Sequence, residues 1–260
     1  MVRLLLISLI SFPLFAGNNS AIIQQKGDET LINIRQVGYT NLATVYCGLS
    51  NGTYSTHTCT KAVINLTSVG NNNVTKAYSQ WSNHSDNTFT VNQQGNSNYG
   101  YLDLDQDDNV GAISQTGDSN HAEILMAGDD TSYAITQTGD GHYAKILAFG
   151  DDADSTITQS GSGNHNAYIY NRNRADNNSS VIVQSGSGNH DADIFWYSDA
   201  DNGEASINQS GSGDHTARLN FYKDNYNVSV AQSGAIDKSF TATYNCTSNC
   251  TKTLTITQYD

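Results

Sequence analysis

Proline, basic residues and long apolar runs are all scarce in this 260-residue chain. The single proline is Pro13, so no later residue would interrupt a β-sheet by lacking a backbone N–H. Only 12 Lys and Arg residues stand against 25 Asp and Glu, and the net charge of −13 argues against nucleic acid as a partner. The longest apolar run, near the N-terminus, is too short to span a bilayer as a helix.

The first 16 residues have the organisation of a secretory signal peptide. Arg3 precedes the apolar run Leu4–Phe15, and the small residues Ala16 and Gly17 follow it. We predict cleavage after Ala16, which leaves residues 17–260 as a single repeat domain. The protein is therefore expected to be secreted.

Four cysteines are present, and an even number in an exported chain favours disulfides. Cys47 and Cys59 flank residues 48–58, whereas Cys246 and Cys250 lie close together in CTSNC. Among the three connectivities we expect local pairing, Cys47 with Cys59 and Cys246 with Cys250. A metal site is the weaker alternative, because no histidine lies near the second pair in the sequence.

A short motif that begins with glutamine recurs along the chain. QSGSGNH occurs at 159–165 and 184–190, and QSGSGDH follows at 209–215. These copies begin 25 residues apart, and repetition at a period of this length indicates a solenoid. Degenerate copies are assigned at Gln25, at Gln36 and at Ser68, which replaces the glutamine. The long step from Gln36 to Ser68 contains the Cys47 to Cys59 segment, which we interpret as a loop inserted into one coil.

Each copy has the pattern of two strands and two turns. A branched aliphatic residue lies two positions before the glutamine, so both side chains face inward on a strand. Glycine and asparagine then predict a turn, a second alternating segment follows, and an acidic turn completes the copy. We therefore predict an all-β fold, a β-solenoid of stacked strand-turn-strand repeats.

Stacked copies about 4.8 Å apart would place identical side chains above one another. Buried glutamines would then satisfy each other in an amide ladder. The residues expected in this structural ladder are Gln36, Gln93, Gln115, Gln137, Gln159, Gln184, Gln209, Gln232, Gln258, Ile113, Ile135, Ile157, Ile182 and Ile207.

The repeat resembles that of the curlins, the subunits of bacterial curli amyloid fibres. QTGDSNHA at 115–122 and QVGYTNLA at 36–43 match the family's Q-x-G-x2-N-x-A centre. The resemblance implies a curli-type fimbrial subunit that polymerises end to end at the cell surface, in the biofilm matrix, and serves adhesion. It also implies that the partners are further copies, other curli-type subunits or a nucleator, and an outer-membrane export machinery. Residues such as Met126 and Trp196 replace the glutamine that closes the family's second strand, which leaves a major and a minor, nucleating subunit both open.

Two other classes are weighed beside this one. A monomeric β-solenoid adhesin would have protected ends. An ice-binding or carbohydrate-binding solenoid would use an outward threonine array, of which Thr156 and Thr158 are members, but equivalent positions interrupt it. No catalytic constellation stands out from the repeats, so we expect neither an enzyme nor a cofactor.

Two repeated polar features are compatible with metal binding. Histidines recur beside the first turn, and stacking would align them in a column. Acidic pairs recur in the second turn, where calcium is an alternative to simple solvation. The plainer structural interpretation is preferred for both sets. They are His121, His142, His165, His190 and His215, and the pairs Asp107 and Asp108, Asp129 and Asp130, and Asp151 and Asp152.

Overall fold

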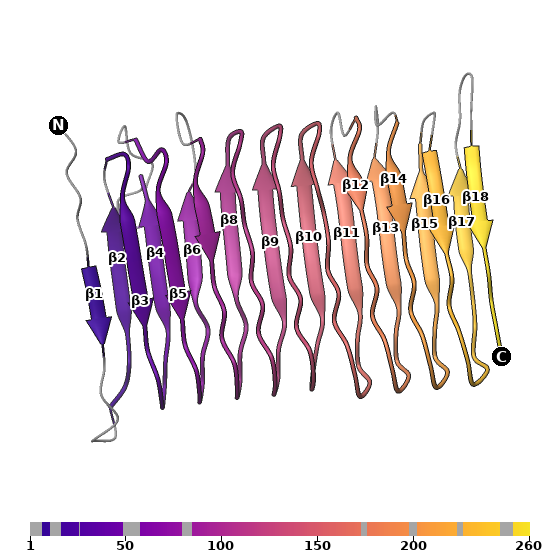
Figure 1. Cartoon of the computed structure of the whole chain (residues 1–260), viewed down its shortest axis with the longest axis horizontal. Helices are drawn as coiled ribbons and strands as arrows, with labels where there is room; N and C mark the ends of the chain where they lie inside the picture. The colour runs from indigo at the N-terminus through magenta and orange to yellow at the C-terminus, as the bar shows by residue number, and fades with distance from the viewer. Residues whose placement is uncertain are drawn as a thin grey trace.

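The structure, a computed structural model, describes residues 7–10, 17–25, 27–48, 58–79, 85–172, 176–197, 202–222, 226–244 and 252–260. These residues form an all-β parallel solenoid and contain no helix, so none that could cross a membrane (Figure 1). Cys246 and Cys250 lie outside the described residues, so their predicted pairing is not addressed.

One ten-stranded sheet runs the whole length of the solenoid in the order β17-β15-β13-β11-β10-β9-β8-β6-β4-β2. Every pair in it is parallel and in register, so that Ala144 lies between Ala122 and Ala167. Equivalent residues of successive copies are therefore stacked, as the repeat predicted. The strands are β2 Ala21–Gln25, β4 Ala43–Cys47, β6 Lys76–Ser79, β8 Tyr101–Asp105, β9 Ala122–Ala127, β10 Ala144–Phe149, β11 Ala167–Arg172, β13 Ala192–Tyr197, β15 Ala217–Phe221 and β17 Thr241–Tyr244.

The opposite side of the solenoid carries two four-stranded sheets separated by irregular backbone. Their orders are β1-β3-β5-β7 and β12-β14-β16-β18. Between them, isolated bridges such as Val110 to Ser132 replace strands. The strands are β1 Ile7–Ile10, β3 Leu31–Arg35, β5 Val63–Thr67, β7 Thr88–Thr90, β12 Ser179–Ser180, β14 Glu204–Ser206, β16 Tyr226–Val230 and β18 Lys252–Ile256.

The central copies differ from the regular first strand that we expected. Ser114, Gln115 and Thr116 all have positive φ angles, of 130°, 59° and 155°. Consecutive residues with positive φ cannot continue a regular strand, whose φ is negative. The backbone still stacks on its neighbours, because the Gln137 N–H donates to Ser114 O at 3.2 Å and the Gly139 N–H donates to Thr116 O at 2.9 Å.

The assignment of Gln25 as the start of a degenerate copy is wrong. Residues 21–25 belong to the ten-stranded sheet, where Ile23 pairs with Val45 and Gln25 with Cys47. This segment is therefore a second strand of its coil. Its alternating pattern fits either side of the solenoid equally well, because both sides bury every other residue.

The N-terminal edge of β3 is paired in the full chain. The backbone of β1 pairs with β3 in parallel, with Ile7 beside Ile32 and Ile10 beside Arg35. Residues 7–10 lie within the predicted signal peptide. Removal of residues 1–16, which stays a prediction, would uncover this edge.

The core between the sheets is filled by the inward aliphatic residues, and Ile113, Ile135 and Ile157 are at most 1% exposed. Trp196 is buried where the neighbouring coils of its column have Asn171 and Phe221. Its indole nitrogen donates a hydrogen bond to Ser180 Oγ at 3.2 Å. A Cβ atom on Gly203 would lie only 1.6 Å from this indole ring, so the tryptophan requires the glycine.

We therefore expect Gly203→Ala to lower the unfolding free energy by about 3 kcal/mol, the upper end of the usual cost of overpacking. The reason is that the added methyl group would occupy the position of the indole ring, so the ring would have to move within a packed core. Gly186→Ala is the matched control, since its Cβ would meet nothing within 4 Å. Urea denaturation of the monomeric protein measures both. Equal stability of the two variants would contradict the packing described.

Candidate functional site

A ladder of glutamine amides runs through the solenoid from Gln93 to Gln258, and all of its members except Gln258 are buried. Each Nε2 donates to the Oε1 of the next glutamine, so the hydrogen bonds all point toward the C-terminus. The steps join Gln93 to Gln115 (2.7 Å), Gln115 to Gln137 (2.6 Å), Gln137 to Gln159 (2.7 Å), Gln159 to Gln184 (2.7 Å), Gln184 to Gln209 (2.8 Å), Gln209 to Gln232 (2.7 Å) and Gln232 to Gln258 (2.7 Å).

The same amides also close the turn of their own coil. Gln137 Nε2 donates to Tyr143 O at 2.6 Å, and Gln159 Nε2 donates to Asn166 O at 2.7 Å. Gln137 and Gln159 have φ angles of 72° and 63°, in the left-handed region that non-glycine residues avoid. The two hydrogen bonds of each amide offset this conformational cost, because they satisfy both N–H groups of the side chain.

Residues 107–139 and 128–161 match the family model of the Curlin associated repeat. These segments are thus similar to curlin associated repeats. The two matches overlap and include three ladder residues, Gln115, Gln137 and Gln159. No curated protein and no solved structure matches the chain.

The ladder is interrupted on the N-terminal side of the curlin repeats. Ser68 stands in the glutamine column and bonds Thr75 Oγ1 at 3.1 Å instead. Gln36 closes its own turn by donating to Leu42 O at 2.9 Å. Its buried Oε1 has no hydrogen-bond partner among the described residues. The acceptor that each later glutamine offers to its neighbour is thus unused at the N-terminal end.

The C-terminal end of the solenoid exposes residues that are core in every other coil. Leu254 and Ile256 are 46% and 38% exposed, whereas their partners Val228 and Val230 on β16 are 2% and 1% exposed. Gln258, the last ladder residue, is also exposed. These side chains face the end of the solenoid, where no further coil of the described chain covers them.

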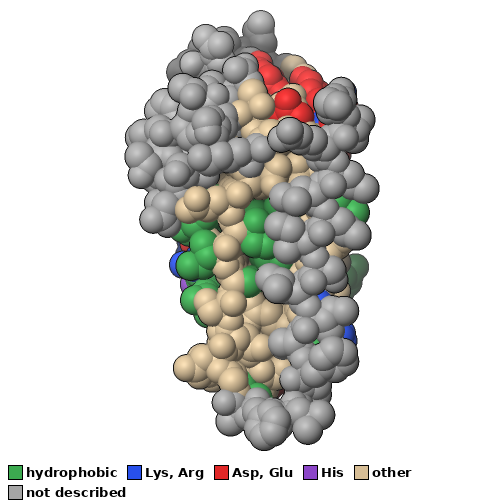
Figure 2. Space-filling model, turned by 90° about the vertical axis from the view of Figure 1, so that its left-hand side faces the viewer, with side chains coloured by type: hydrophobic (Ala, Val, Ile, Leu, Met, Phe, Trp, Pro, Cys, Tyr) green, Lys and Arg blue, Asp and Glu red, His purple; other side chains and the backbone are tan. Residues whose placement is uncertain are grey.

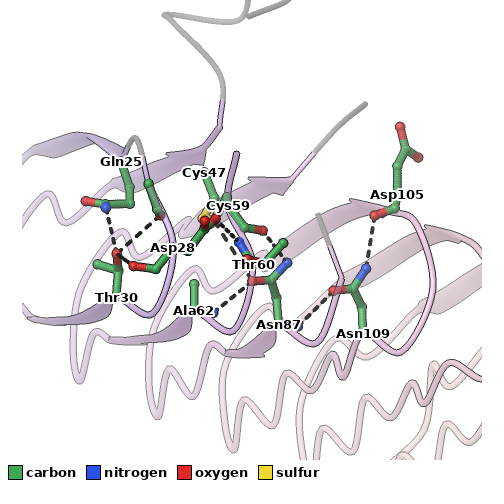
Figure 3. Close-up of a disulfide and its surroundings, with 11 residues drawn as sticks. Gln25, Asp28, Thr30, Cys47, Cys59, Thr60, Ala62, Asn87, Asp105 and Asn109 are labelled. Atoms are coloured by element: carbon green, nitrogen blue, oxygen red, sulfur yellow. Dashed lines mark hydrogen bonds between the residues drawn. A yellow bond between two sulfur atoms is a disulfide. The ribbon is translucent and has the colours of Figure 1, made fainter. Parts of the chain in front are cut away.

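A disulfide joins Cys47 at the end of β4 to Cys59 before β5, with the two Cα atoms 5.6 Å apart. Figure 3 shows this crosslink beside Asn87 of the following coil. Asn87 of the next coil donates to Cys59 O at 2.9 Å and accepts from the Ala62 N–H at 2.9 Å. The segment that carries Cys59 is therefore bound both to the end of β4, by the crosslink, and to the next coil, by Asn87.

A second buried column lies beside the first turn. It begins with asparagines, where Asn98 Nδ2 donates to Asn73 Oδ1 at 2.8 Å and Asn120 Nδ2 donates to Asn98 Oδ1 at 2.9 Å. It continues as parallel imidazole rings 4.8 to 4.9 Å apart. The rings are those of His142, His165, His190 and His215, all of them fully buried.

His121 does not belong to this column, although the sequence placed it there. Asn120 occupies the column, and His121 lies outside it between the rings of Tyr99 and Tyr143, at 4.8 and 4.7 Å. The prediction was wrong because the copies were compared by the presence of a histidine. The spacing from the ladder glutamine indicates the correct residue, because Asn120 lies five residues after Gln115 and His142 lies five residues after Gln137.

The histidine nitrogens contact backbone carbonyl groups. Nδ1 of His165 lies 3.0 Å from Gly188 O and its Nε2 contacts Ser160 O, and His190 repeats this arrangement with Gly213 and Ser185. In the described part of the chain, no group of three or more His, Cys, Asp or Glu side chains is placed to hold a metal ion. The column is thus a packed element of the core.

Acidification should destabilise the folded protein through this column. Burial, together with the neighbouring His142 and His190, lowers the pKa of His165 from 6.5 to about 4. Burial also lowers the pKa of His190, against the opposing charge of Asp214. The unfolded chain binds the proton first, so the stabilisation is complete above about pH 6.5 and is lost as the pH falls toward 4. For His165 alone we expect a loss of about 2 kcal/mol between pH 7.5 and 5.

Urea denaturation of the monomer at pH 7.5 and pH 5 measures this loss, and His165→Asn is the matched variant. Asparagine fills the same column in earlier coils and does not titrate. The variant should lose less stability on acidification than the parent by about 2 kcal/mol. An unchanged acid sensitivity would show that other groups cause it.

The acidic turns stack as well. The Asp129 N–H donates to Asp107 Oδ1 at 2.9 Å, and the Asp151 N–H donates to Asp129 Oδ1 at 2.8 Å. Burial and the like charges of Asp129, Asp176 and Asp152 raise the pKa of Asp151. Acidic side chains gather at the upper edge of the end-on view in Figure 2, the edge at which these turns lie in Figure 1.

Proposed function

We propose that this protein is a secreted structural subunit that polymerises end to end into curli-like amyloid fibres, for biofilm matrix and surface adhesion. The curlin repeats at 107–161 and the parallel solenoid support this proposal. Curlin repeats belong to a structural family, and no catalytic role is proposed. The partner is a second copy of the chain, with other curli-type subunits or a nucleator as further candidates.

The observation that carries the proposal is the exposed core at the C-terminal end. Leu254 and Ile256 expose apolar surface that the next coil buries everywhere else. The outer edge of β18 has no strand partner in the described chain, so its N–H and C=O groups are available for pairing. A monomeric adhesin would be expected to cover such an end.

The N-terminal end offers a matching surface once β1 is removed. The edge of β3 then becomes free, and Gln36 Oε1 supplies the unused acceptor of the ladder. The exposed Gln258 ends the ladder on its donating side. Stacking β3 of one subunit on β18 of another continues both the sheet and the ladder in the same direction.

Residues 17–260, purified under denaturing conditions and diluted into neutral buffer, test the proposal. We expect concentration-dependent growth of fibres that bind thioflavin T and diffract at about 4.8 Å along the fibre axis. Sedimentation and electron microscopy follow the reaction. A chain that stays a folded monomer at high concentration would instead support the adhesin.

A further inference from the structure

The outward face of the ten-stranded sheet contains a pocket of about 400 Å³ over β10 and β11. It is lined by Tyr143, Lys145, Leu147, Tyr168, Tyr170 and Arg172. The pocket lies where the outward side chains of two paired strands differ in shape. Lys145 pairs with Tyr168, and Leu147 pairs with Tyr170. A lysine and a leucine on one strand thus lie next to aromatic rings on the following strand.

Two tyrosine rings form a flat wall of this pocket. The planes of Tyr168 and Tyr170 differ by only 15°, and their centroids are 6.4 Å apart. Residues two apart on a strand are separated by roughly 6.6 Å, so the rings lie side by side. The ring of Tyr170 stacks on Phe195 of β13 at 5.1 Å and 7°. Its other face is therefore turned toward β10, above the shorter Leu147.

A tyrosine hydroxyl and a cation lie beside this wall. Burial and the carboxylates of Asp191 and Asp193 raise the pKa of Tyr168 to about 12, so its hydroxyl keeps its proton, which it donates to Asp191 Oδ2 at 3.5 Å. Arg172, at the end of β11, is exposed and lies 5.3 Å from the Tyr197 ring. No carboxylate pairs with Arg172 among the described residues, whereas Lys145 is bound to Glu123 at 2.8 Å.

We propose that this pocket binds an acidic polysaccharide, with a sugar ring against Tyr168 and Tyr170 and a uronate carboxylate on Arg172. An aromatic wall with a few polar groups at its rim is the composition of a ligand pocket, and its volume is in the usual range. Arginine binds carboxylates through two parallel N–H groups. The net charge of −13 repels polyanions, so a local cation without a carboxylate partner among the described residues decides where one binds.

The pocket is formed by neighbouring strands within one subunit, so binding does not depend on the proposed polymerisation. In a fibre the same site would recur on every subunit, and a long polysaccharide would contact several sites at once. The fibre would thereby be linked to the polysaccharide that surrounds it. This function goes beyond that of a structural filament.

Titration calorimetry with an oligogalacturonate and with a neutral cello-oligosaccharide of equal length tests the proposal on the monomeric protein. We expect the oligogalacturonate to bind more tightly. Arg172→Gln should weaken its binding about tenfold and leave the neutral sugar unaffected, whereas Tyr170→Ala should weaken both about tenfold. Tyr46→Ala, which removes a stacked ring 5.0 Å from Tyr78 on the same face, is the control and should change neither.

Circular dichroism and urea denaturation of each variant show whether it folds. If Tyr170→Ala does not fold, Arg172→Gln still tests the proposal, because Arg172 is exposed. Absence of binding to both sugars would overturn the proposal. So would equal affinity for the two, or an oligogalacturonate affinity that Arg172→Gln leaves unchanged. Each of these outcomes is independent of whether fibres form.

Discussion

We expect the double substitution Ile256→Pro and Gln258→Lys to leave the protein as soluble, folded monomers. Proline removes a backbone N–H from the edge strand β18 and cannot adopt the geometry of a paired strand. Lysine would place a charge in the amide column, where a second subunit would have to bury it without a partner. Fibre growth, followed by thioflavin fluorescence and sedimentation, should fall below a tenth of the parent's rate.

Thr255→Lys is the matched control, because it adds a charge to the same strand between the inward Leu254 and Ile256. Its side chain points outward, so growth should continue. Unchanged circular dichroism would show that all three proteins are folded. If the double variant forms fibres as fast as the parent, addition of subunits through β18 is wrong.

The second large effect is expected from the centre of the ladder. Gln159→Leu keeps the approximate size of the side chain but removes its amide. Gln137 then loses an acceptor, and Gln184 Oε1 and Asn166 O lose a donor, in a site that is 1% exposed. Each unsatisfied buried group costs about 1–3 kcal/mol, so we expect a loss of about 3 kcal/mol or more in unfolding free energy.

Gln24→Leu serves as the control, since Gln24 is exposed on β2 and such a surface change costs about 0.5 kcal/mol or less. Urea denaturation of the monomers measures both variants. A loss below about 1 kcal/mol for Gln159→Leu would mean that the ladder follows the fold without stabilising it.

The stacked solenoid was predictable because its signal is repeated. Branched residues two positions before each glutamine, such as Ile113 and Ile135, needed only the period-two rule to be placed inside. The parallel register followed from the requirement that identical copies lie on one another. A single copy, such as residues 21–25, does not show to which side of the solenoid its strand belongs. Comparison of many copies resolves this for the regular repeats.

Features that occur once were not predictable in the same way. The requirement of Trp196 for Gly203 depends on contact between opposite sides of the solenoid, which no local pattern reports. The pairing of β1 with β3 joins a predicted signal peptide to the domain, two segments that the sequence assigns to separate roles. The aromatic wall of Tyr168 and Tyr170 depends on what lies beside it on β10, so it became visible only in the stack.

The histidine column shows the intermediate case. The sequence found its members His142, His165, His190 and His215 but not the asparagines that continue it, because the two residue types look unrelated in a pattern. In the structure the asparagine and the histidine side chains both contact the adjacent coil. A comparison by position in the coil, in place of residue type, would have joined them.

The structure of a fibre grown from residues 17–260, determined by electron cryomicroscopy at side-chain resolution, would show how successive subunits join. We expect β18 of one subunit to pair in parallel with β3 of the next, with Gln258 Nε2 about 2.9 Å from Gln36 Oε1 across the junction. Subunits that join through the faces of their sheets, with β18 still unpaired and Leu254 and Ile256 still exposed, would contradict it.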